Sequence, residues 1–144
     1  MRFWDSSALV PLVVEQSSSR RVEEWVDEDA SMVIWALAEI EIVSALRRLV
    51  REGTLAERQA RSAEELAETL VARMHTVTDL EQTKTIAKRV LRLHVLRAAD
   101  ALQLAAALCW CEGRPTGRIF HTFDRRLADA AQREGFKVIP DAFP

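Results

Sequence analysis

The chain begins MRFWDSSALVPLVV (residues 1–14), and this stretch sets the class of fold. Residues 2–5 form a short apolar run that stops at an acid, which predicts a β-strand. Residues 6–14 predict a helix, with Ser6 or Ser7 as its N-cap and Pro11 tolerated in its first turn. A strand followed at once by a helix is the repeating unit of α/β proteins.

The rest of the chain continues this alternation. Further strands are predicted at residues 32–35, 76–78, 118–123 and 136–139. Further helices are predicted at residues 17–29, 36–52, 54–75, 79–94, 97–112 and 124–134. The helix capped by Thr54 is expected to turn Leu66, Leu70 and Val71 inward, and the helix after Arg97 is apolar on nearly every side and therefore buried. The pattern predicts a helix-rich three-layer α/β/α fold around a mainly parallel sheet of four to five strands.

Length and composition narrow the class of protein. The 144 residues correspond to one domain, residues 1–144, with 49% hydrophobic and 29% charged residues. A formal net charge of −2 excludes a strongly basic coat protein and an acidic disordered tail. No apolar run is long enough to span a bilayer. Cys109 and Cys111 lie two residues apart on one predicted helix, so their side chains point to nearly opposite sides and cannot pair with each other. We therefore expect a reduced, cytoplasmic protein without a membrane partner.

Carboxylates recur where the predicted strands end. In open parallel sheets, ligands bind beyond the carboxyl ends of the strands. The polar residues expected at that edge are Asp5, Glu39, Glu41, Asp100, Thr122 and Asp124. Like charges gathered in one place repel and raise one another's pKa, and a cation would relieve that cost. Because the donors are all oxygens, the pattern favours Mg²⁺ or Mn²⁺ over zinc.

Four motifs appear in order along the chain. They are Asp5-Ser6-Ser7-Ala8-Leu9, residues 41–48 (EIVSALRR), residues 96–105 (LRAADALQLA) and residues 122–128 (TFDRRLA). Together they resemble the PIN-domain family, in particular the VapC-type toxins of type II toxin–antitoxin systems, over the whole chain. The resemblance implies a catalytic metal site of Asp5, Glu41, Asp100 and Asp124, supported by the hydroxyls of Ser6 and Thr122.

The same resemblance implies a function and partners. It implies a Mg²⁺-dependent endoribonuclease, with Mn²⁺ able to substitute, that cuts tRNA or another structured RNA. It also implies inhibition by a cognate antitoxin and a homodimer. Hydrolysis by a metal-activated water would leave 5′-phosphate and 3′-hydroxyl ends. Without the four proposed ligands the chain carries 20 basic and 18 acidic residues, a net charge of +2 that suits an RNA substrate.

Helical periodicity and the family resemblance favour different glutamates, Glu39 and Glu41. Helical spacing aligns Glu39 with an apolar stripe, which favours Glu39 as the inward acid. That stripe consists of Ile42, Val43, Leu46 and Val50. The family pattern places its glutamate four residues before an Ala-Leu pair, which favours Glu41. We prefer Glu41 and keep Glu39 as the alternative.

Basic residues near these motifs are candidates for binding RNA phosphates. They are Arg48, Arg97, Arg125 and Arg126, and the competing interpretation is a solvated face with local ion pairs. The apolar helix from Ala8 to Val14, together with Trp25, is a weak candidate for contact with a partner protein.

Two other functions compete with the nuclease. A phosphoryl-transfer enzyme with Asp5 as nucleophile would need a second aspartate where Ser7 stands. A non-catalytic PIN-like domain that binds RNA or protein is the other alternative, and it need not be stabilised by Mn²⁺.

Overall fold

The computed structural model describes residues 1–143, whose five strands form one parallel sheet in the order β3-β2-β1-β4-β5. The strands are β1 (Arg2–Trp4), β2 (Met32–Trp35), β3 (His75–Val77), β4 (Ile119–His121) and β5 (Lys137–Ile139). The first strand lies at the centre, where Phe3 is in register with Val33 of β2 and Phe120 of β4. The expectation of a parallel sheet of four to five strands is confirmed.

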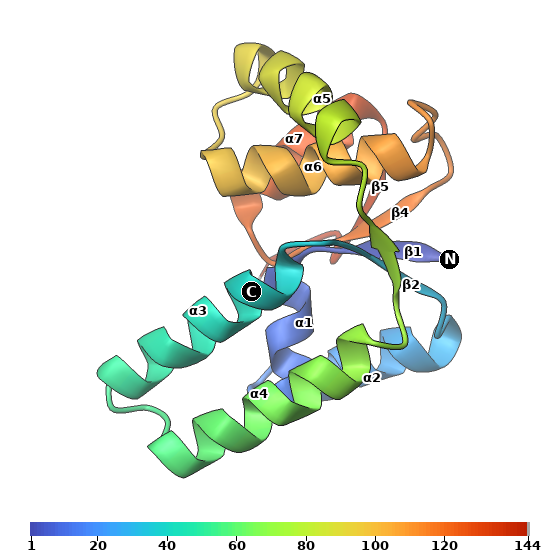
Figure 1. Cartoon of the computed structure of the whole chain (residues 1–144). Helices are drawn as coiled ribbons and strands as arrows, with labels where there is room; N and C mark the ends of the chain where they lie inside the picture. Colours follow the sequence, from blue (N-terminus) through green and yellow to red (C-terminus); the bar gives the residue numbers. More distant parts are fainter. Residues whose placement is uncertain (144) are drawn as a thin grey trace.

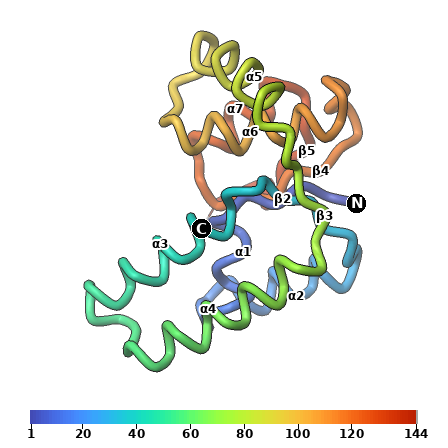
Figure 2. Tube along the Cα trace, in the orientation of Figure 1, coloured from blue at the N-terminus to red at the C-terminus, as the bar shows by residue number. Residues whose placement is uncertain are grey.

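Within residues 1–143, seven helices cover the two faces of this sheet. They are α1 (Ser6–Val13), α2 (Ser19–Glu28), α3 (Ala38–Arg51), α4 (Glu57–Val71), α5 (Leu80–Leu93), α6 (Ala98–Trp110) and α7 (Arg125–Glu134). Helices α1 to α4 lie on one side of the sheet and α5 to α7 on the other (Figures 1 and 2). This is the predicted three-layer arrangement, because strands buried on both faces need helices on both.

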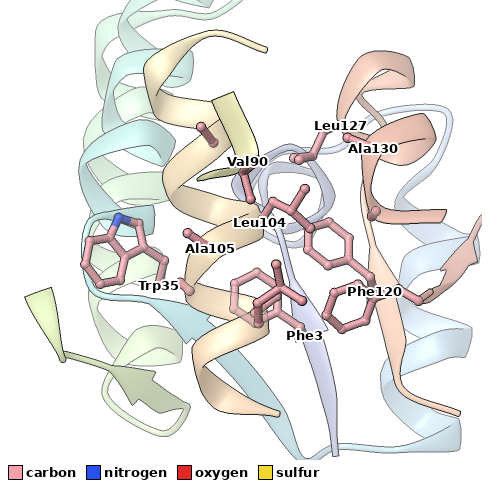
Figure 3. Close-up of a cluster of buried hydrophobic side chains, with 14 of the residues drawn as sticks. Phe3, Trp35, Val90, Leu104, Ala105, Phe120, Leu127 and Ala130 are labelled. Atoms are coloured by element: carbon pink, nitrogen blue, oxygen red, sulfur yellow. The ribbon is translucent and has the colours of Figure 1, made fainter. Parts of the chain in front are cut away.

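Successive residues of β1 supply two separate cores. Phe3 points into the core beneath α6 and α7, where its ring stacks on Phe120 at 5.1 Å between centroids (Figure 3). Trp4 points the opposite way, into the core shared with Ile34 and Ile42. Alternation of side chains along a strand places them on opposite faces. Both Phe3 and Trp4 are fully buried, so this short strand anchors both layers.

Two helix starts differ from the sequence expectation. The N-cap of α1 is Asp5, whose side chain accepts a hydrogen bond from Ser7 N, so assigning the cap to Ser6 or Ser7 was wrong. Helix α4 begins at Glu57 after an N-cap at Ala56, two residues beyond the expected cap at Thr54. An aspartate at the strand end can accept from the first free backbone amides, and it therefore starts the helix one residue earlier.

The buried face of α4 also differs from the expectation. Leu66 is 42% exposed and Leu70 and Val71 are only half-buried. The fully buried residues of this helix are Ala60, Ala63 and Ala67. Helix α4 packs against both α1 and α3, and small side chains permit that close approach.

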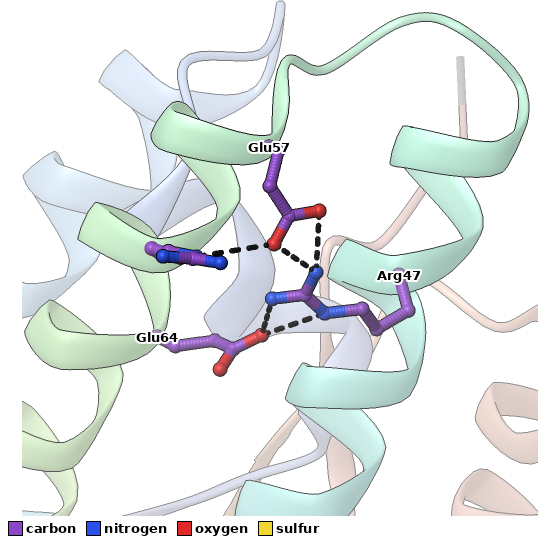
Figure 4. A network of polar contacts seen from close by, with 4 residues as sticks. Arg47, Glu57 and Glu64 are labelled. Atoms are coloured by element: carbon purple, nitrogen blue, oxygen red, sulfur yellow. Dashed lines mark hydrogen bonds and ion pairs between the residues drawn. The ribbon is translucent and has the colours of Figure 1, made fainter.

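An ion-pair cluster joins α3 to α4 (Figure 4). The guanidinium of Arg47 donates to both oxygens of Glu57, at 2.7 and 2.9 Å, and to Glu64. Arg61 donates to the same Glu57 at 3.3 Å. The cluster fixes the two helices of this hairpin relative to each other at their polar surface.

The residues suggested for partner contact are largely buried. Trp25 is 7% exposed and packs on the ring of His121 at 5.0 Å between centroids, so its proposed role in partner contact was wrong. Ala8, Leu9 and Val10 of α1 are buried in the same core. Within residues 1–143, none of the helices is both long and apolar enough to cross a membrane.

Candidate functional site

The sheet topology creates a ligand-binding position beside β1. The chain runs from β1 to β2 on one side, whereas β4 pairs with β1 on the other. At such a switch point the connections leave the two carboxyl ends in opposite directions and open a crevice. Asp5 follows β1 directly, and its backbone N–H donates to His121 O at the end of β4, at 2.9 Å. Thr122 and Asp124 follow β4, so the first sequence candidates meet at this crevice.

Hydroxyl groups hold the carboxylate of Asp5. Thr122 Oγ1 donates to Asp5 Oδ2 at 2.9 Å, and Ser7 Oγ donates to the same oxygen. Ser7 Oγ in turn accepts from Phe123 N at 2.9 Å, which ties α1 to the segment after β4. Burial raises the pKa of Asp5, although the hydrogen bonds from Ser7 and Thr122 oppose the increase. Asp5 is therefore rigidly oriented, and it is only 3% exposed.

Asp124 is connected to Asp5 through one hydroxyl. The backbone N–H of Asp124 donates to Thr122 Oγ1 at 3.0 Å, so this hydroxyl bridges the two acidic residues. Asp124 Oδ1 accepts from Leu127 N at 2.8 Å, which makes Asp124 the N-cap of α7. The interpretations of Asp124 as a helix cap and as a site acid are compatible, because a carboxylate has a second oxygen and several lone pairs.

Glu41 extends from α3 to the same crevice. Ser6 Oγ donates to Glu41 Oε2 at 3.0 Å, and Gln103 Nε2 donates to Glu41 Oε1 at 3.0 Å. Burial and the charge of Asp5 raise the pKa of Glu41 to about 7. A nearby positive charge would therefore favour the ionised form of this glutamate at neutral pH.

Glu39, the alternative, does not line this pocket. The buried stripe of α3 consists of Ala38, Ile42 and Leu46, and the residues on its pocket-facing flank include Glu41 and Ala45. The structure thus brings Glu41, and not Glu39, to the other acids. The sequence stripe misplaced Glu39 because it counted Val43 and Val50, which are only half-buried.

Asp100 completes the group of acids from the first turn of α6. Burial raises its pKa to about 6, with further increases from the charges of Asp124 and Asp5. Arg97 and Arg126 act in the opposite direction, so both guanidinium groups lie near this carboxylate. Asp100 therefore lies between the acidic centre and a basic rim.

The crevice is an open pocket of about 810 Å³. Its lining includes Ser6, Ser7, Glu41, Asp100, Asp124 and the four arginines suggested for phosphate contact, Arg48, Arg97, Arg125 and Arg126. The first turns of α1, α3, α6 and α7 all meet here. Because the N-terminal end of a helix carries partial positive charge, four such ends favour anions at this position.

The donor set fits a hard divalent cation. Asp5, Glu41, Asp100 and Asp124 offer only oxygen, and mutual repulsion contributes to the raised pKa values of three of them. Within residues 1–143 no three Asp, Glu, His or Cys side chains already stand close enough together to hold a metal ion. Mg²⁺ keeps several waters and needs only one or two protein carboxylates, so an open acidic pocket suits it.

Sequence reasoning missed two residues of this site, Ser7 and Gln103. Ser7 lies two residues after Asp5, the spacing at which a cap residue meets the following backbone N–H and side chain. Gln103 is the one polar residue between Ala101 and Leu108 in an otherwise apolar helix. That isolated polar position was the signal that could have identified it.

Comparison with known proteins gives the same family as the sequence motifs. The PIN domain family model matches residues 2–133. Two relatives from Mycobacterium tuberculosis are Ribonuclease VapC45 (strain CDC 1551 / Oshkosh) and Ribonuclease VapC49 (strain ATCC 25618 / H37Rv). Each is 31% identical over 138 residues, covering 96% of this chain and 94% of the relative.

Solved structures share the fold at lower identity. FitAcB from Neisseria gonorrhoeae is 17% identical with a TM-score of 0.66, and the match covers 96% of both chains. PAE2754 from Pyrobaculum aerophilum is 19% identical with a TM-score of 0.62, covering 96% of this chain and 88% of the other. The arrangement of strands and helices in this chain is therefore similar to that in both solved structures.

Proposed function

This chain belongs to the PIN domain family, and from that premise we propose that it is a Mg²⁺-dependent endoribonuclease, the toxin of a toxin–antitoxin pair. One observation carries the proposal: carboxylates from four separate elements meet at the switch point of the sheet. Support comes from the two relatives named as ribonucleases, each 31% identical over nearly the whole chain.

The chain's own residues orient the reacting groups. When bound, a divalent cation supplies an activated water and neutralises negative charge at the scissile phosphate. Asp5, Glu41, Asp100 and Asp124 would hold that cation. Thr122 and Ser7 fix the carboxylate of Asp5, and Ser6 fixes that of Glu41, so the ligands need little reorganisation. No side chain acts as a nucleophile, and the products carry 5′-phosphate and 3′-hydroxyl ends.

The basic rim would hold the RNA. Arg97 and Arg126 lie close enough to lower the pKa of Asp100, and Arg48 and Arg125 line the same pocket. Guanidinium groups bind phosphates through paired, charge-assisted hydrogen bonds. Such contacts position the backbone without reading bases, so shape selects the target. We propose tRNA or another structured RNA as the substrate, and expect Mn²⁺ to replace Mg²⁺.

The proposal also covers the domain organisation of the chain and its protein partners. We propose that residues 1–144 act as a single cytoplasmic domain, that a cognate antitoxin inhibits it, and that two copies form a homodimer. The acidic centre is open to solvent on the pocket side, so an inhibitor protein can reach it.

Sequencing the ends of cellular RNA after brief induction tests the proposal. Wild type should produce new 5′-phosphate ends, and Asp5→Asn should produce none. Purified protein should lose cleavage in EDTA and regain it with Mg²⁺ or Mn²⁺. Equal cleavage in EDTA, or full activity of Asp5→Asn, would contradict the metal mechanism.

A matched pair of substitutions on α3 tests the choice of glutamate. Glu41→Gln should lose cleavage, whereas Glu39→Gln, two residues earlier on the same helix, should retain it. If Mn²⁺ neither stabilises the wild type nor supports cleavage, the non-catalytic binding domain becomes the better description.

A further inference from the structure

Gln103 is a polar residue that is fully buried in the protein interior. It lies in the middle of α6 and is 0% exposed, and the residues that follow it on this helix, Leu104, Ala105 and Leu108 among them, belong to the hydrophobic core. Its Oε1 atom is buried with no hydrogen-bond partner among residues 1–143. Burying an unpaired carbonyl oxygen opposes folding, and a leucine of similar size would avoid that cost. Packing therefore does not explain a glutamine at this position.

The other end of the same amide has a specific partner. Gln103 Nε2 donates to Glu41 Oε1 at 3.0 Å, across 62 residues of sequence. Helix α6 lies on one face of the sheet and α3 on the other, so this bond joins the two layers at the carboxyl edge of the strands (Figure 1). Ser6 Oγ holds the second oxygen of Glu41 at 3.0 Å. The glutamate is thus held by α6 on one side and by α1 on the other.

Restraint matters more for Glu41 than for Asp5 and Asp124. Asp5 and Asp124 have short side chains that are fixed by helix caps and by Thr122. Glu41 has one more rotatable bond and extends from the flank of α3 into an open pocket. Without two donors, its carboxylate would sample several rotamers, and binding a cation would have to order it.

We propose that Gln103 is a positioning residue that holds the carboxylate of Glu41 in its cation-binding orientation. The inference rests on the proposed function, because it assigns Glu41 to the cation. Gln103 itself contacts neither cation nor RNA, and it acts only through Glu41.

The test measures Mn²⁺ affinity of the full chain by calorimetric titration in a double-mutant cycle. Gln103→Leu should weaken Mn²⁺ binding by about 10–100-fold, the usual effect of losing a hydrogen bond behind a metal ligand. Glu41→Gln should also weaken it. The combination Glu41→Gln with Gln103→Leu should bind Mn²⁺ no more weakly than Glu41→Gln alone, because the glutamine acts only through the glutamate.

Two readouts separate positioning from general support of the fold. The melting temperature of cation-free Gln103→Leu should stay close to that of wild type, since removing the unpaired buried oxygen offsets the loss of the hydrogen bond to Glu41. At limiting Mn²⁺, kcat for RNA cleavage should fall while KM for RNA stays constant, because the substrate contacts are unchanged. Thr83→Val, at a fully buried polar position on α5, is the matched control and should bind Mn²⁺ like wild type.

Different results would contradict the positioning role of Gln103 and the proposed metal site. If Gln103→Leu binds Mn²⁺ as wild type does, the positioning role is wrong and the metal site stands. The same conclusion follows if the losses of Mn²⁺ affinity in Gln103→Leu and Glu41→Gln add up in the double variant. If wild type binds no Mn²⁺, or Glu41→Gln binds it unchanged, the proposed site is wrong and the inference falls with it. Should Gln103→Leu not fold, Gln103→Met, an unbranched side chain of similar length, carries the same expectations.

Discussion

Replacing Thr122 with valine should weaken both the fold and the acidic site. The buried hydroxyl donates to Asp5 Oδ2 at 2.9 Å and accepts from Asp124 N at 3.0 Å. Valine has nearly the same shape but can do neither. Asp5 is only 3% exposed, so water cannot replace the lost donor easily.

The size of the effect follows from those two contacts. A hydrogen bond to a charged group contributes about 1.5–3 kcal/mol and a neutral one about 0.5–1.5 kcal/mol, so the free energy of unfolding should fall by roughly 2–4 kcal/mol. For a chain of this size about 1 kcal/mol shifts Tm by roughly 3 °C, which predicts a decrease of about 6–12 °C. Because burial already raises the pKa of Asp5, proton uptake limits the loss at acidic pH.

Thermal unfolding followed by circular dichroism and titration with Mn²⁺ would measure the two effects. Mn²⁺ affinity of Thr122→Val should fall by about 10–100-fold, because the first carboxylate is no longer oriented. Thr122→Ser is the control: it keeps the hydroxyl and should retain most of the affinity. If the valine and serine variants melt at the same temperature and bind Mn²⁺ equally, the bridging hydroxyl has no such role.

Three further predictions concern pH, backbone conformation and surface charge. Acidification from about pH 8 to about pH 5 should stabilise the cation-free chain and weaken Mn²⁺ binding, because the raised pKa values of Glu41, about 7, and Asp100, about 6, make the native state take up protons there. This stabilisation is complete below the ordinary carboxyl pKa and is lost as the pH rises through 7; melting curves should show it diminished in Glu41→Gln. Gly135→Ala should lower the urea unfolding free energy by about 1–2 kcal/mol, since φ is 110° and the new Cβ would lie 3.2 Å from Pro115 Cγ. Gly113→Ala, where nothing lies within 4 Å, should cost less. Arg47→Ala should lower Tm slightly at low salt and less at high salt, leaving Mn²⁺ binding unchanged; an equal loss at both salt concentrations would argue against ion pairing with Glu57 and Glu64.

Local sequence pattern was sufficient for the elements and their order. The alternation of strands and helices predicted the parallel sheet covered on both faces, which the structure confirms. It also predicted that α6 is buried, because apolar residues on every side leave no face for solvent. These features depend on side chains a few residues apart, whose spacing is fixed by the geometry of a strand or a helix.

Helix ends and faces were less predictable. The buried alanines of α4, in place of Leu66, follow from how closely that helix approaches α1 and α3. The burial of Trp25 follows from its packing on His121 of β4, in the core that Trp4 also enters. The spacing of residues within one helix does not show how closely that helix approaches its neighbours. Periodicity alone therefore predicted the wrong buried face for α4 and an exposed, partner-binding role for Trp25.

For the acidic site, the sequence by itself determined that acids follow the strands and therefore collect at one edge of a parallel sheet. Helical spacing favoured Glu39 and the family pattern favoured Glu41, and only the tertiary structure decided between them. Glu41 contacts Ser6 of α1 and Gln103 of α6, whereas Glu39 does not line the pocket. The reason is physical. Strand order fixes an edge, but the choice between neighbouring residues on α3 depends on how that helix is rotated against elements from both faces of the sheet.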